Sequence, residues 1–139
     1  MTYLLKAALC GAALLTMNLA TAADLTIVVD DVKSADGMLM VALYDSAGAF
    51  LKTPVNATGT RAATSDNKVV FKNLPEGVYA FAVYHDANSN GKMDRNLVGI
   101  PTEDYAFSNN AMGKMGPPAY DEAKFTLPAA GATVRVTVK

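Results

Sequence analysis

The sequence has little chemistry of the kinds that enzymes commonly use. It contains one cysteine, one histidine and no tryptophan among 139 residues. The cysteine, Cys10, lies in an apolar N-terminal stretch, and His85 has no second histidine to act with it. These absences exclude a disulfide framework and a zinc site built from His and Cys. The chain also has no Gly-x-Ser-x-Gly segment, so we expect a protein that is not an enzyme.

Clusters of basic residues are also absent. The chain has 12 Lys and Arg residues against 13 Asp and Glu residues, which gives a net charge of −1. The basic residues occur singly rather than in runs. Nucleic-acid binding needs a basic patch or stripe, so we expect no nucleic-acid partner.

Long apolar runs are confined to the first 23 residues. Lys6 precedes an apolar stretch at about residues 7–15, and small residues occupy positions 20–23. This pattern predicts a secretory signal peptide at residues 1–23, with one domain at residues 24–139. The apolar stretch is shorter than the roughly 20 residues of a membrane span, and Cys10 follows Leu9 rather than the small residue of a lipoprotein site. We therefore expect a periplasmic or secreted protein with no membrane span in the mature chain.

The rest of the chain alternates apolar and polar residues with a period of two. Such runs predict short strands, and the apolar residues on both faces of residues 77–85 predict a central strand. Residues 53–67 suggest a loop that could include a weak edge strand, and a closing hairpin is expected around residues 128–132. The predicted fold is all-β: an antiparallel, immunoglobulin-like β-sandwich of about seven strands with one long decorated loop. The expected core residues are Leu25, Ile27, Leu39, Val41, Leu43, Val69, Phe71, Tyr79, Phe81, Val83, Phe125, Val134 and Val136.

The segment after His85 has the ligand spacing of a calcium loop. An EF-hand-like loop takes oxygen ligands at alternate positions around a glycine, which here is Gly91. The twelfth position, where such a loop has a bidentate glutamate, is Leu97, so Glu103 or Asp104 would have to fold back. The candidate Ca²⁺ ligands are Asp86, Asn88, Asn90, Lys92 through its carbonyl, Asp94 and Glu103. The alternative is a turn-rich loop in which Asp and Asn side chains bind their own backbone.

A soft-metal site is a second possibility for the same segment. Imidazole and thioether groups bind Cu(I), and three methionines occur in the long loop that follows His85. The candidate copper ligands are His85, Met93, Met112 and Met115.

The first hypothesis for the function is an exported, non-catalytic binding or accessory module for an unknown protein or small-molecule ligand. Exposure of Tyr105, Phe107 and Tyr120 as an aromatic patch would favour it.

Several segments together resemble one family. They are GMLMVALY at 37–44, LPEGVYA at 74–80, HDANSNGKMD at 85–94, GIPTEDYAFSNNA at 99–111 and GPP at 116–118. The sequence is similar to the uncharacterised bacterial family catalogued as domain of unknown function 2141. The resemblance implies an exported protein with a prealbumin-like sandwich, and it implies no established activity.

Overall fold

The computed structural model describes residues 22–139, which form eight strands and two short helical segments. The expected signal peptide lies outside the described residues, except that Ala22 and Ala23 begin the first strand. The strands are β1 (Ala22–Asp30), β2 (Met38–Tyr44), β3 (Asn56–Arg61), β4 (Asn67–Pro75), β5 (Gly77–Asp86), β6 (Tyr105–Phe107), β7 (Phe125–Leu127) and β8 (Ala132–Thr137). The helical segments are the 3-10 turn η1 (Ser108–Asn110) and α1 (Tyr120–Ala123).

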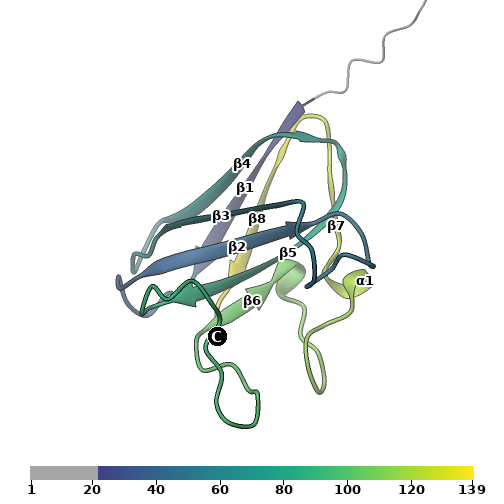
Figure 1. The fold of residues 1–139 in the computed structure, drawn as a ribbon. Helices are drawn as coiled ribbons and strands as arrows, with labels where there is room; N and C mark the ends of the chain where they lie inside the picture. The colour runs from purple at the N-terminus through teal and green to yellow at the C-terminus, as the bar shows by residue number, and fades with distance from the viewer. Residues whose placement is uncertain (1–21) are drawn as a thin grey trace, which may run out of the picture.

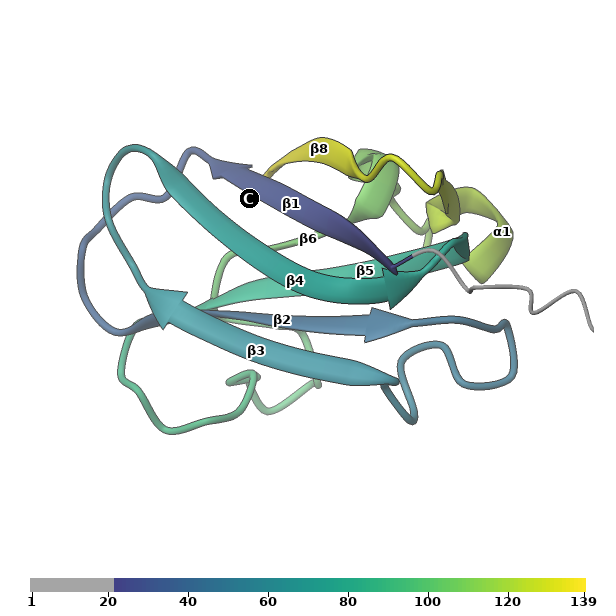
Figure 2. The same ribbon diagram turned by 90° about the horizontal axis from the view of Figure 1, so that it is seen from above.

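The strands form two sheets that pack face to face. The small sheet has the order β4-β1-β8, and the large sheet has the order β3-β2-β5-β6, with β7 also paired to β5. Figure 1 labels the strands, and Figure 2 shows the two layers from above. The predicted β-sandwich is confirmed, and β5 is the central strand because β2, β6 and β7 all pair with it.

The interior consists of the residues that the alternating pattern places on one face of each strand. Leu25, Leu39 and Phe81 are fully buried between the sheets. Eleven of the expected core residues are buried, whereas Phe125 and Val134 are partly buried and pack against the core. Truncation of a fully buried aromatic such as Phe81 removes about 3–5 kcal/mol of stability in comparable cores.

The expected closing hairpin is wrong. β7 joins β5 in the large sheet, whereas β8 pairs in parallel with β1 in the small sheet. The chain changes sheet at residues 128–131, where Gly131 has a φ of +84° and an added Cβ would lie 2.7 Å from the Asp24 carbonyl oxygen. Alternation predicts which face of a strand is buried. It does not distinguish a hairpin from this crossover, because β7 and β8 would bury the same faces in either arrangement. Ala123 ends α1, just before β7.

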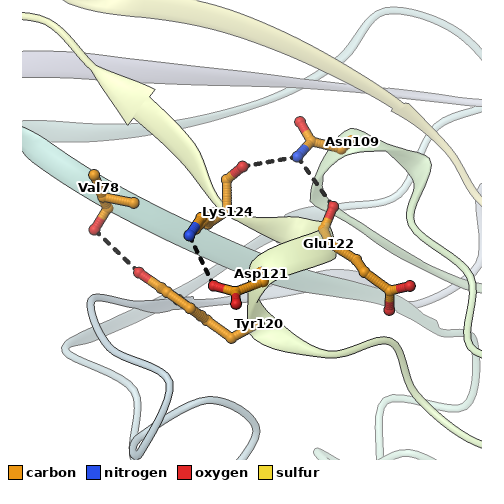
Figure 3. A network of polar contacts seen from close by, with 6 residues as sticks. All are labelled: Val78, Asn109, Tyr120, Asp121, Glu122 and Lys124. Atoms are coloured by element: carbon orange, nitrogen blue, oxygen red, sulfur yellow. Dashed lines mark hydrogen bonds and ion pairs between the residues drawn. The ribbon is translucent and has the colours of Figure 1, made fainter.

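A second apolar cluster lies on the outer face of the large sheet, where α1 and η1 cover one end. Its buried members are Tyr44, Phe50, Ala80, Phe107 and Ala123. Figure 3 shows the contacts that hold α1 there: the Asn109 amide donates to the carbonyls of Glu122 and Lys124 at 3.3 and 2.8 Å. The outer face is therefore partly covered by the chain itself. No helix among residues 22–139 is both long enough and apolar enough to cross a membrane.

Candidate functional site

The polar loop, residues 86–104, begins at the end of β5 with a buried carboxylate. Asp86 is 2% exposed, and its two carboxylate oxygens accept the backbone N–H groups of Asn90 and Gly91 at 3.0 and 2.8 Å. Gly91 has a φ of +79°, which glycine adopts without steric cost. The side chain at the first ligand position thus folds the following residues around itself.

The next three candidate ligands converge on one another at the surface. The amide groups of Asn88 and Asn90 donate to the two carboxylate oxygens of Asp94 at 2.6 and 2.7 Å. These two hydrogen bonds lower the pKa of Asp94 from its usual value, because they stabilise the charged carboxylate. Asp94 therefore stays ionised into mildly acidic conditions.

The oxygens of the two amide side chains meanwhile bind the loop backbone. Asn88 accepts the N–H of Asn90 at 3.2 Å, and Asn90 accepts the N–H of Lys92 at 3.1 Å. These are Asx-turn contacts, so the turn-rich interpretation describes the hydrogen bonding of the loop. Each of these two amide oxygens keeps a second lone pair.

Glu103 folds back onto the loop, as a completed calcium site requires. Its carboxylate accepts the N–H of Asp94 at 3.0 Å, and the Thr102 N–H donates to the Asp94 carbonyl at 2.9 Å. Asp104, the other residue considered for this place, instead forms an ion pair with Lys33 at 2.9 Å. Leu97, at the twelfth position, is fully exposed.

The structure thus brings the predicted Ca²⁺ ligands into one loop. Within residues 22–139, no three side chains of the His, Cys, Asp and Glu types are grouped closely enough to hold a metal by themselves. A cation here would therefore depend on amide and backbone oxygens in addition to carboxylates. Oxygen donors of this kind suit Ca²⁺.

The pKa of Tyr84 is affected by the negative charges of the loop. Its pKa is raised above the ordinary 10.0, first by burial and then by the nearby carboxylates of Asp86, Glu103 and Asp94. All three carboxylates therefore lie close enough to the Tyr84 hydroxyl to oppose its ionisation.

The candidate copper ligands are not brought together. His85 is 5% exposed, faces the core beside Leu39, and its Nε2 lies 2.7 Å from the carbonyl oxygen of Asp36. Met93 and Met115 instead line a groove on the opposite face of the large sheet. Met112 is exposed.

An apolar groove of about 850 Å³ lies on that outer face beside the polar loop. We call it the outer-face groove. Its floor includes Ala57, Ala42 and Ala82, which pair directly across β3, β2 and β5. Three small side chains in one row leave a depression that larger neighbours surround. The surrounding side chains include Met40, Tyr44, Leu51, Tyr84, Met93, Arg95, Val98, Ile100, Pro101, Tyr105, Phe107, Lys114, Met115 and Pro117.

The expected aromatic patch is not an exposed one. Phe107 is buried, and its ring packs against Phe50 with centroids 6.3 Å apart. Tyr120 packs on the other side of Phe50 at 5.7 Å, and Tyr105 lies partly buried at the wall of the groove. Of these aromatics, Tyr105 and Phe107 line the groove.

Sequence reasoning missed the groove because its floor depends on strand pairing. The three alanines are widely separated in the chain, and only the register of β3, β2 and β5 aligns them. A usable signal was present in β2, where Ala42 lies at an outward position between Met40 and Tyr44. The partners of these alanines could not be known without the register.

Comparison with known families adds one finding. Residues 27–135 match the model of a family described as an uncharacterized protein conserved in bacteria, DUF2141. The chain belongs to this family. The match confirms the resemblance carried by the loop and turn segments. Neither the curated proteins nor the solved structures give a match to the chain.

Proposed function

We propose that this DUF2141 protein is an exported, non-catalytic binding module whose polar loop is held in shape by Ca²⁺. One observation carries the proposal: hydrogen bonds to side chains or to backbone N–H groups link Asp86, Asn88, Asn90, Asp94 and Glu103 within the one loop that turns at Gly91. All of them carry the hard oxygen ligands that Ca²⁺ prefers.

The residues divide into two groups by their expected role at the cation. Asp86 and Asp94 supply charge, and Glu103 adds charge from the returning strand of the loop. Asn88, Asn90 and the Lys92 carbonyl would supply neutral oxygens. The amide hydrogens of Asn88 and Asn90 stabilise the charged carboxylate of Asp94. Ca²⁺ would take over that task and would link both ends of the loop.

Export and lack of catalysis are supported by the sequence and by the surroundings of His85. The N-terminal 23 residues have the pattern of a signal peptide, and no cysteine follows them. The imidazole faces the core and contacts a backbone carbonyl, so His85 has no access to a ligand in the outer-face groove.

Isothermal titration calorimetry of chelator-treated protein tests the calcium proposal. Ca²⁺ should bind once per chain with a Kd of about 10⁻⁴–10⁻³ M, the range of extracellular modules with few charged ligands. Asp94→Asn should weaken binding at least tenfold, because it removes a charge and keeps the side-chain shape. Asp66→Asn, at an exposed turn outside the polar loop, should not change the affinity.

Two results would contradict the calcium proposal. One is the absence of binding heat with wild-type protein at millimolar Ca²⁺. The other is an equal loss of affinity in Asp94→Asn and Asp66→Asn, which would indicate general charge attraction rather than a site in the polar loop.

A further inference from the structure

We propose that the outer-face groove binds a small amphipathic ligand with an apolar body and one anionic group, of the class of medium-chain carboxylates. The inference rests on the binding role proposed above and names the class of ligand for it. None of the proposed Ca²⁺ ligands is among the residues that line the groove.

The groove has the size and surface of a small-molecule site. Its volume of about 850 Å³ lies in the usual range for ligand pockets, roughly 300–1,000 Å³. The alanine row forms a smooth floor of methyl groups. Val98 and Ile100 on one wall and Met115 on the other are all largely exposed. Exposed apolar residues gathered around a concavity mark a binding surface, because leaving them in water is unfavourable.

The charges on the groove favour an anion. Arg95 and Lys114 are the charged residues of its lining, and both are cationic. Within residues 22–139, neither lies within ion-pair distance of a carboxylate. Arg95 donates one hydrogen bond to the Gly99 carbonyl at 3.0 Å, which leaves other N–H donors of its guanidinium for a ligand. An anionic head group would pair with these cations while the apolar body covers the alanine floor.

The groove and the polar loop share one segment of chain. Met93, Arg95, Val98 and Ile100 belong to the polar loop and also line the groove. Tyr84 lines the groove and is close to the carboxylates of the loop. Whatever orders the loop therefore positions one wall of the groove.

The test compares three probes that share an alkyl chain and differ in head group. Decanoate, decan-1-ol and decyltrimethylammonium are titrated separately into chelator-treated protein, with binding followed by NMR chemical shifts. Decanoate should bind most tightly, the alcohol more weakly, and the cation least. Lys114→Gln should weaken decanoate binding roughly twofold to fivefold, as expected for an exposed charge pair, and should leave decan-1-ol binding unchanged.

Two further variants test the location. Ala57→Phe fills the floor from the exposed edge strand β3, and it should abolish binding of both decanoate and decan-1-ol. Val70→Phe and Lys68→Gln are matched controls on the exposed face of β4 in the other sheet, and they should leave both affinities unchanged.

The proposal is overturned if the three probes bind equally, if Ala57→Phe retains decanoate binding, or if the protein is a dimer that Ala57→Phe converts to a monomer. The last result would assign the groove to a second copy of the chain. The probes are used without Ca²⁺, so the two proposals can fail separately. A failure of decanoate to bind would contradict the groove proposal and not the calcium proposal, and a failed calcium titration would contradict the calcium proposal and not the groove proposal.

Discussion

Asp86 has two roles at the start of the polar loop: it is a proposed Ca²⁺ ligand, and it accepts backbone hydrogen bonds that stabilise the turn. Its carboxylate is buried and satisfied by the backbone N–H groups of Asn90 and Gly91, so it stabilises the turn even without a cation. Removing a buried acceptor of this kind costs about 1–3 kcal/mol, because two donors lose their partner. Asp94, on the surface, is therefore the cleaner position for separating cation binding from loop stability.

Tyr84 provides a reporter for the charge of the loop at the residue scale. We expect Ca²⁺ to lower the raised pKa of Tyr84 toward the ordinary 10.0, because a bound cation offsets the three carboxylates that raise it. Tyr44 is the control, since burial alone raises its pKa. NMR titration of the two tyrosine rings, with and without Ca²⁺, measures both values. An equal shift at Tyr44 and Tyr84, or no shift at Tyr84, would contradict a cation beside the loop.

At the scale of elements, the start of β2 fixes the start of the polar loop. Gly37 has a φ of +69°, and a Cβ added to it would lie 1.9 Å from the Asp86 carbonyl oxygen. The backbone of residue 37 therefore touches the end of β5 in a way that only glycine allows. The position of the loop depends on this close approach.

Gly37→Ala should therefore destabilise the protein by more than about 1–3 kcal/mol, the usual cost of one strained residue, because a clash adds to the strain. Gly48→Ala is the matched control, since nothing lies within 4 Å of its Cβ position. Urea denaturation followed by circular dichroism compares the two. Similar stabilities for both variants would show that the approach of residue 37 to Asp86 relaxes without cost.

The elements also show what the sequence could predict. Alternation was sufficient for β1, β2 and β4, because each buries one apolar face over six or more residues, and apolar residues on both faces were sufficient for β5. It failed for the short β6 and for the partner of β8, since three residues carry little periodicity and no pattern encodes a parallel neighbour. The calcium-loop spacing is local, so the polar loop could be predicted. The groove depends on register between strands, so it could not.

At the scale of the whole molecule, the two apolar layers have different purposes. The interior between the sheets accounts for the stability of the sandwich. The outer cluster around Phe50 and Phe107 fastens α1, η1 and the turn at residues 46–53 to the large sheet and leaves the adjoining groove open. One face of the large sheet thus carries both the proposed ligand site and the base of the polar loop.

The tyrosines predict how the stability of the whole molecule depends on pH. Folding raises the pKa values of Tyr44, Tyr79, Tyr84 and Tyr120, each first through burial. A raised pKa means that the folded chain holds its proton longer than the unfolded chain. This stabilisation is complete below the ordinary value of 10.0 and is lost as the pH rises through the folded values.

Urea midpoints at about pH 8 and about pH 10.5 measure this loss, and the midpoint should fall at the higher value. Tyr84→Phe should reduce the fall, because it removes one of the raised groups. A midpoint that is equal at both pH values, or a fall that is as large in Tyr84→Phe as in the wild type, would contradict the role assigned to these hydroxyls.

The most direct test of the central claim is the melting temperature of chelator-treated protein with and without Ca²⁺. At about 100 times the Kd, Ca²⁺ should add about 2.7 kcal/mol and raise the Tm by about 10 °C, because it binds only the folded loop. Mg²⁺ should raise it less, since it demands a tighter octahedron of ligands. Ser89→Ala should keep the response and Asp94→Asn should lose it. A wild-type melting curve unchanged at about 100 times the expected Kd, roughly 10–100 mM Ca²⁺, would contradict the account and would leave the polar loop as a set of Asx-turns.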